Sequence, residues 1–299
     1  PKILQVKICY LSFIMALEEG DILLVTSLFL FLCYFVFKGY KNTQSVAVNE
    51  INLDDSEKQA GLKILHLSDL HLENISVTPE MITENVRNHD IDLIELTGDF
   101  IDRKRSIPKL IPYLEELKKL EPTHGIYAVF GNHDYVLSEP YFKQLKEVLK
   151  AHGIKTLQNK HETIEINGKR LNIIGIDDFS TSRSDVEKSY AGTAEGYNLV
   201  LTHDPNVVLA MQNYHFDYLL SGHFHGGQIH WPKPYHLLRM GKLVRMNMIK
   251  GLHRHNGRPF YISEGLGQTG VNIRIGSRPE ITIHDIALKK ESKSAAIAG

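Results

Sequence analysis

Apolar and polar positions divide the chain into a long apolar N-terminal stretch and a region with the rhythm of an α/β domain. In that region, apolar runs of strand length alternate with segments of helical periodicity. The three strand and helix pairs are 62–67 and 79–88, 92–97 and 107–120, and 126–130 and 139–151. This alternation predicts βαβ units around a largely parallel sheet.

Closer spacing of strand-like runs predicts a second sheet further along the chain. Residues 162–166 and 170–174 flank the dipeptide Asn167-Gly168, which favours an antiparallel hairpin on a two-residue turn. Further strands are expected at 198–202, 218–221, 259–263 and 281–286. Residues 289–299 are expected to form a disordered tail.

The N-terminal region, residues 1–40, is expected to contain one transmembrane helix. Residues 22–37 carry no charge, and with Lys38 snorkelling the apolar stretch extends to Tyr40, which is long enough for a bilayer. A buried core helix or the apolar part of a signal peptide are the alternatives. Basic Lys38 and Lys41 after the span favour the cytoplasmic side of the cell membrane for the α/β domain.

A polar linker is expected over 41–60, followed by the α/β domain over 61–288. The chain has 299 residues, of which 42% are hydrophobic and 23% charged, which is an ordinary globular balance. Its net charge of -1 argues against nucleic acid as a partner. Cys9 and Cys33 both lie in the apolar N-terminal part, so neither a disulfide framework nor a thiolate metal site is expected.

Five short clusters of metal-ligand residue types each follow a strand-like run. They are Asp69-Leu70-His71, Gly98-Asp99, Gly131-Asn132-His133-Asp134, His203-Asp204 and Gly222-His223-Phe224-His225. Each cluster alone is typical of a surface turn. Loops at the carboxyl ends of strands gather groups from distant sequence, so together the clusters predict a shared site. Two carboxylates within about 4 Å repel by roughly 4 kcal/mol, which divalent cations would relieve. A dinuclear metal site for phosphate ester hydrolysis is the prediction.

These clusters resemble the pattern of the calcineurin-like metallophosphoesterase superfamily, which reads Asp-x-His, Gly-Asp, Gly-Asn-His-Asp/Glu, His and Gly-His-x-His. The resemblance implies a four-layer α/β/β/α sandwich of two mixed β-sheets flanked by helices. It also implies two divalent metal ions, which mixed oxygen and nitrogen ligands would allow to be Mn, Fe or Zn.

The resemblance further assigns the ligands to the two ions. It implies that one ion is held by Asp69, His71 and His225, that the other is held by Asn132, His203 and His223, and that Asp99 bridges both. His133 is then the catalytic histidine, and we expect the adjacent Asp134 to orient or charge it. Asp102 either forms a hydrogen bond near the site or is a solvated loop carboxylate.

Three further segments look like a narrower, bacterial membrane-anchored branch that includes UDP-2,3-diacylglucosamine pyrophosphatases: 67–72, 222–229 and 265–267. This likeness implies a phosphodiesterase or pyrophosphatase acting near the membrane on a small or lipid-linked phosphate substrate. Phe224 stands where this branch usually has a small hydroxyl residue. A nuclease, a protein phosphatase or a metal-free scaffold on the same fold are the alternatives.

The segment 231–258 is basic and apolar, and no Asp or Glu occurs between Tyr218 and Ser263. It is either a solvated loop with core anchors or a lid that contacts an anionic substrate or an anionic membrane surface. The spacing Gly265-x-Gly267-x-x-Gly270 imitates a dinucleotide-binding loop. Because the following residues 271–275 look like a strand rather than a helix, we do not expect a nucleotide cofactor.

Overall fold

The computed structural model describes residues 19–53, 61–230 and 233–288. The chain divides into two units, one up to Lys41 and one from Asn42 onward. The disordered tail predicted at 289–299 lies outside the described residues, as do residues 1–18.

The N-terminal unit contains the helix α2, Glu19–Asn42. Its segment from Gly20 to Asn42 has a mean hydropathy of 2.2 in its most apolar window, and 0% of that window is buried. At 1.5 Å per residue the helix is about 36 Å long, enough to cross a hydrocarbon core of roughly 30 Å. Its length and composition are therefore those of a membrane span, and a buried core helix does not fit its exposure.

The second unit is built on two six-stranded mixed sheets. In order across sheet A, the strands are β1 Ala47–Asn52, β12 Glu280–Ile286, β2 Leu62–Leu67, β3 Leu93–Thr97, β4 Ile126–Val129 and β5 Ile154–Thr156. Across sheet B they are β10 Gly251–His255, β11 Arg258–Ile262, β9 Tyr218–Ser221, β8 Tyr197–Leu201, β7 Lys169–Gly175 and β6 Lys160–Ile166. Parallel pairing runs from β2 to β5 in sheet A and links β7, β8, β9 and β11 in sheet B.

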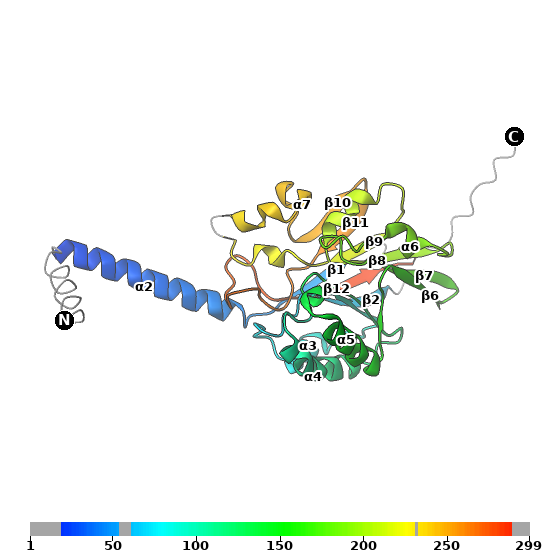
Figure 1. Cartoon of the computed structure of the whole chain (residues 1–299), viewed down its shortest axis with the longest axis horizontal. Helices are drawn as coiled ribbons and strands as arrows, with labels where there is room; N and C mark the ends of the chain where they lie inside the picture. The colour runs from blue at the N-terminus through cyan, green and yellow to red at the C-terminus, as the bar shows by residue number, and fades with distance from the viewer. Residues whose placement is uncertain (1–18, 54–60, 231–232, 289–299) are drawn as a thin grey trace. The chain divides into compact units, whose positions relative to one another are not determined.

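Helices cover the outer faces of both sheets, which confirms the predicted four-layer sandwich (Figure 1). The outer face of sheet A packs against α3 Pro79–Val86, α4 Ile107–Lys118 and α5 Glu139–Ala151. The layer over sheet B is thinner and consists of α6 Val186–Tyr190, α7 Lys242–Arg245 and the 3₁₀ turns Pro205–Ala210 and Tyr235–Arg239.

The hairpin predicted around Asn167-Gly168 is confirmed. Strands β6 and β7 are antiparallel, and Ile166 pairs with Lys169 across a two-residue turn. Both turn residues have positive φ, 52° for Asn167 and 72° for Gly168, as a type I′ turn requires.

The face of sheet A that looks toward sheet B carries a polar row. The residues paired in register along it are Asn49, Thr282, His66, Glu95, Tyr127 and Lys155. His66 lies 2.8 Å from the hydroxyl of Thr97, at the end of β3. Burial raises the pKa of Glu95 well above its ordinary value, which favours the neutral form of this interior carboxyl.

Two sequence predictions about the elements are wrong in part. The linker predicted at 41–60 contains β1, a half-polar edge strand that pairs with β12. Within the described residues, the strand-like segment 271–275 forms one bridge, between Ile275 and Ile229. No helix occurs between Gly270 and Leu288, so a pyrophosphate would find no helix N-terminus in this described segment.

Candidate metal centre

All five predicted clusters lie just beyond the carboxyl end of a strand. Asp69 and Asp99 lie two residues past β2 and β3, and Asn132 lies three residues past β4. His203 and His223 lie two residues past β8 and β9, so sheet B contributes the other half. Because the contributing strands of each sheet are parallel, their ends meet at one edge of that sheet.

Asp69, His71 and His225 form a first group of potential ligands, with their ligand atoms all within 4.8 Å of one another. Nε2 of His225 lies 3.3 Å from Oδ1 of Asp69, and Nε2 of His71 lies 3.9 Å from the same oxygen. All three residues are buried. This grouping matches one of the two predicted ligand sets.

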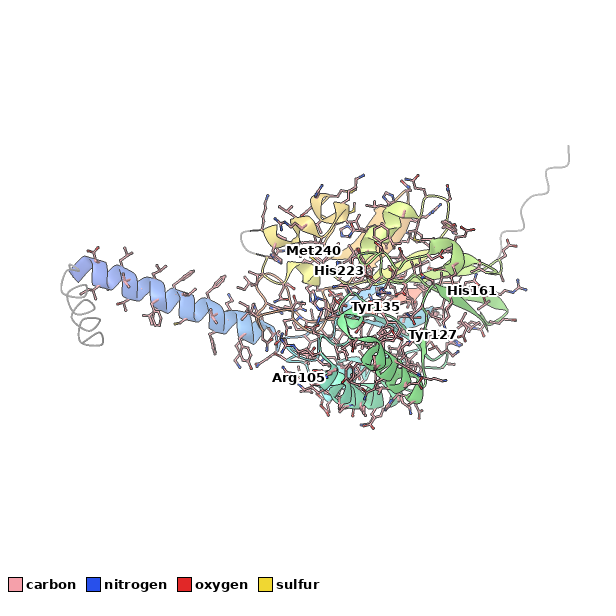
Figure 2. The ribbon with its side chains drawn as sticks, in the orientation of Figure 1. Arg105, Tyr127, Tyr135, His161, His223 and Met240 are labelled. Atoms are coloured by element: carbon pink, nitrogen blue, oxygen red, sulfur yellow. The ribbon has the colours of Figure 1, made fainter. Side chains whose placement is uncertain are left out.

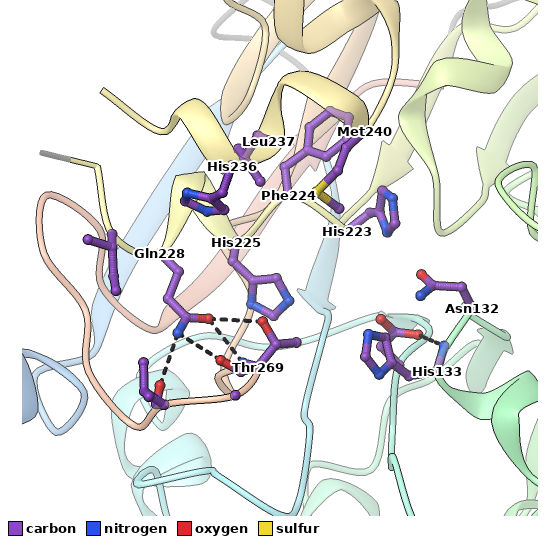
Figure 3. Close-up of a pocket in the computed structure, with 14 residues that line it drawn as sticks. Asn132, His133, His223, Phe224, His225, Gln228, His236, Leu237, Met240 and Thr269 are labelled. Carbon is purple, nitrogen blue, oxygen red and sulfur yellow. Dashed lines mark hydrogen bonds between the residues drawn. The ribbon is translucent and has the colours of Figure 1, made fainter. Parts of the chain in front are cut away.

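Asp99, His203 and His223 form a second buried group. Nε2 of His203 lies 3.0 Å from Oδ2 of Asp99 and 3.1 Å from Nδ1 of His223. The same Asp99 oxygen lies 3.5 Å from Nε2 of His71, so Asp99 stands between the two groups. Asn132 lines the adjoining cavity with Asp99 and His223, and its buried Oδ1 has no hydrogen-bond partner among the described residues (Figure 3).

Hydrogen bonds on the far side of two imidazoles aim their lone pairs into the site. Nδ1 of His203 lies 2.8 Å from the carbonyl oxygen of Thr97, which can only accept, so Nδ1 carries the hydrogen. Nδ1 of His71 likewise faces a carboxylate oxygen of Asp102 at 2.7 Å. In their neutral form these rings would present Nε2 lone pairs toward Asp99, an arrangement that divalent cations would stabilise.

The electrostatics agree with a cation site. Burial disfavours protonated His203, yet the carboxylate of Asp99 raises the pKa of His203 well above its ordinary value. A divalent cation beside Asp99 would take the place of such a proton. The oxygen and nitrogen donors present fit a pair of hard or borderline divalent ions.

The backbone around the ligands is strained. Asp69, His71, Asp99, His223 and His225 all have positive φ, with values of 51°, 39°, 54°, 78° and 50°. For residues with a side chain, this region is sparsely populated and costs of order 1 kcal/mol or more each. Such strain is typical of functional sites.

Glycines in the motifs make room for the ligands. A Cβ at Gly222 would lie 1.9 Å from Oγ of Ser68 and 2.1 Å from Oδ2 of Asp69. A Cβ at Gly131 would lie 2.2 Å from Oδ1 of Asp99. These close approaches explain why glycine precedes the ligand in two of the motifs.

The carboxylate that contacts His133 belongs to Asp102. Oδ1 of Asp102 lies 3.0 Å from Nδ1 of His133 and 2.7 Å from Nδ1 of His71. Burial opposes protonation of His133, but the hydrogen bond that His133 donates to Asp102 and the charge of Asp99 raise the pKa of His133 above its ordinary value. Of the two readings that the sequence left open for Asp102, the structure therefore selects the hydrogen-bonded one.

Asp134 does not have the predicted role of orienting His133. Its Oδ2 accepts the backbone N–H groups of Asp99 and Gly131, both at 2.9 Å, and its Oδ1 accepts that of Phe100 at 2.9 Å. Asp134 therefore ties together the loops after β3 and β4. Proximity in sequence to His133 favoured Asp134. The spacing Gly-Asp-x-x-Asp, which ends at Asp102, was the feature of the sequence that could have indicated the carboxylate in contact with His133.

A cavity of about 390 Å³ opens beside the ligands (Figure 3). One part of its wall consists of site residues, including His133, and another includes Phe224, Leu237 and Met240. Leu237 and Met240 come from the basic segment 231–258, of which 231–232 lie outside the described residues. The same segment buries Leu243 in the core, so it anchors the fold and also walls the cavity.

Sequence analysis missed Arg274, which is fully buried behind the site. Its Nη1 donates to the carbonyl of Glu264 at 2.8 Å, to Oγ of Ser277 at 2.9 Å and to the carbonyl of Arg278 at 2.8 Å. Its Nη2 donates to the carbonyls of Gly265 and Gly267 at 3.0 and 2.6 Å. Ser277 in turn donates to the carbonyl of His225 at 2.8 Å. A single arginine in an apolar run was the one available signal.

Comparison with known proteins agrees with this geometry. A family model described as calcineurin-like phosphoesterase matches residues 62–227. Metallophosphoesterase YkoQ of Bacillus subtilis (strain 168) is 61% identical over 255 residues, which cover 84% of this chain and 94% of YkoQ. Phosphodiesterase YaeI of Escherichia coli (strain K12) is 28% identical over 238 residues, 77% of this chain and 84% of YaeI. A transmembrane protein with a metallophosphoesterase domain from Danio rerio is 31% identical over 250 residues, 78% of this chain and 54% of that protein.

The matched region contains every strand that carries a predicted ligand, from β2 to β9. Its Asp and His groups can bind metal, as the two divalent ions used by this family require. The chain therefore belongs to the calcineurin-like phosphoesterase family and is a metal-dependent phosphoester hydrolase.

Proposed function

We propose that the protein is a membrane-anchored phosphodiesterase or pyrophosphatase that acts on a small or lipid-linked phosphate substrate. The observation that carries this proposal is the cavity beside the ligands, whose wall changes from metal-binding and acid groups to apolar side chains. A phosphate would lie at the first part, and an organic arm of the substrate would lie against Phe224, Leu237 and Met240. Bare phosphate would leave the apolar wall in contact with water.

The metal ligands would be divided between two ions as the family resemblance implies. Asp69, His71 and His225 would hold one ion, Asn132, His203 and His223 would hold the other, and Asp99 would contact both. When bound, two divalent ions supply Lewis acidity and lower the pKa of water from about 15.7 toward ~7. Asp102 and Thr97 hold the imidazoles of His71 and His203 in the tautomers that such ligation needs.

His133 is proposed to protonate the leaving oxygen. Its Nδ1 is engaged by Asp102, so Nε2 is the nitrogen available to a substrate in the cavity that His133 lines. The negative charges of Asp102 and Asp99 favour its protonated form. A positioned general acid of this kind contributes about 10²- to 10⁴-fold to the rate.

The cavity favours these substrates over nucleic acid. No Lys or Arg occurs among the described residues that line it. A nuclease would need cations along the path of the polyanion. The nuclease alternative is therefore not favoured.

The helix α2 supports action at a membrane, since its composition suits a span. Lys38 and Lys41 favour the cytoplasmic side for the catalytic domain under the positive-inside rule. Protease digestion of intact and of permeabilised cells tests this placement. Cleavage of the domain in intact cells would refute it.

Hydrolysis assays test the function directly. The full chain, purified in detergent and loaded with Mn²⁺, Fe²⁺ or Zn²⁺, is assayed with an aryl phosphodiester, an aryl phosphomonoester and a UDP-sugar lipid. We expect the diester or the pyrophosphate to be cleaved faster than the monoester. His133→Asn should retain its metal and lose about 10²- to 10⁴-fold in rate on a diester with an alkyl leaving group. His215→Asn, at an exposed histidine, is the matched control. Preference for the monoester would refute the proposal.

A further inference from the structure

A second cavity of about 360 Å³ adjoins the first. Among the described residues, the two cavities share His223 and Met240 in their walls. Figure 2 shows both residues in the part of the domain built on sheet B, and Figure 3 shows them next to each other. Met240 and His223, a proposed metal ligand, therefore border both cavities beside a single reaction centre.

The second cavity differs from the first in its chemistry. Arg239 and Lys242 line it, both are exposed, and neither has an ion pair within the described ranges of the chain. Polar groups from Ser180, Asp204 and Asn206 lie in the same wall. The two cations outnumber the one carboxylate, that of Asp204, whose Oδ1 already accepts the backbone N–H and the side-chain amide of Asn206. The cavity thus offers two cations and several polar groups, whereas no Lys or Arg lines the first.

We propose that this second cavity is a subsite for the polar arm of the substrate, a group that carries hydroxyls and a further negative charge such as a sugar phosphate. The apolar arm occupies the first cavity, and the scissile phosphate lies at His223 between them. This inference rests on the proposed function, since only a diester or pyrophosphate has two arms to place. Asp204 and Ser180 suit hydroxyl groups, and Arg239 and Lys242 suit the additional charge.

Binding of two nucleotides that differ by one phosphate tests the subsite. The Mn²⁺-loaded full chain in detergent is titrated calorimetrically with thymidine 3′,5′-bisphosphate and with thymidine 5′-monophosphate. Two exposed cations should favour the bisphosphate by about three- to thirtyfold in Kd. The double variant R239A/K242A should reduce this ratio to about one. The charge-matched double variant R245A/R254A removes two exposed cations of the same segment that lie outside this cavity, and should keep the wild-type ratio.

A wild-type ratio near one would overturn the subsite, and so would an equal loss of preference in R245A/R254A. Hydrolysis of the p-nitrophenyl esters of the same two nucleotides separately reports the proposed function. Cleavage of both esters without a binding preference would refute the subsite alone. A preference that depends on Arg239 and Lys242, without any cleavage, would support the subsite and refute the diesterase proposal.

Discussion

The substitution Asp102→Asn tests how the site holds two histidines with one carboxylate. The amide keeps the shape of the side chain and removes its charge. Hydrogen bonds to charged groups contribute about 1.5–3 kcal/mol, compared with about 1 kcal/mol for neutral ones. Asp102 accepts from both His71 and His133, at 2.7 and 3.0 Å, so roughly 2 kcal/mol of stabilisation should be lost. If all of it acts on the transition state, the rate falls by about thirtyfold.

The assay for this variant combines kinetics with pH dependence. Because Asp102 raises the pKa of His133, the substitution should lower that pKa. His133 donates its proton only below its pKa, so the alkaline limb of kcat/KM should move to lower pH. Diesters with an alkyl leaving group should lose more rate than aryl diesters, which need less protonation of the leaving oxygen.

One matched control variant accompanies Asp102→Asn, and either of two results would contradict the prediction. Asp90→Asn, at an exposed aspartate, should leave rate, metal content and pH profile unchanged. An unchanged alkaline limb in Asp102→Asn would refute the argument that this carboxylate controls the proton on His133. Equal rate losses for alkyl and aryl diesters would refute the acid role of His133 itself.

Three further predictions concern stability. Asp134→Asn should lower the free energy of unfolding by about 1–3 kcal/mol in urea titrations, because its amide NH₂ would face backbone N–H donors. His133→Asn should cost less than Asp134→Asn, because the contact between His133 and Asp102 is partly exposed to solvent. Equal losses of stability in the two variants would contradict the structural role of Asp134. Arg274→Lys should cost about 2–4 kcal/mol in the same titration, because one ammonium cannot reach all five acceptors, and a cost within error would contradict this account. Chelation of the metals should lower Tm in calorimetry, and Mn²⁺ should restore it. An unchanged Tm would count against metal ions in the buried groups.

Much of the fold was predictable from hydrophobic spacing. The strand β2 and the helix α5 have the predicted bounds. The strand is a short, largely apolar run, and the helix repeats its buried residues Phe142, Leu145 and Leu149 at helical spacing. The strand β1 was missed because its sequence AVNEIN is half polar and pairs on only one side, at the sheet edge. A half-polar segment of this kind has the composition of a linker and is easily taken for one.

The candidate site was predictable as a set of residues but not as a set of contacts. The ligands that form the two buried groups were identified from their order along the chain. The carboxylate that contacts His133 was not identified in this way. Asp134 begins the 3₁₀ turn Asp134–Val136, whereas Asp102 contacts the imidazole from the loop after β3. Arg274 donates to backbone carbonyl groups, which every residue has, so the residue pattern does not reveal these contacts.

Each buried ligand group takes members from both sheets. Asp69 and His71 follow a strand of sheet A while His225 follows one of sheet B, and Asp99 meets His203 in the same way. An ion bound there would be held by residues of both sheets and would link the two halves of the sandwich. Cellular supply of the metal would then govern how long the enzyme survives proteolysis as well as how fast it turns over.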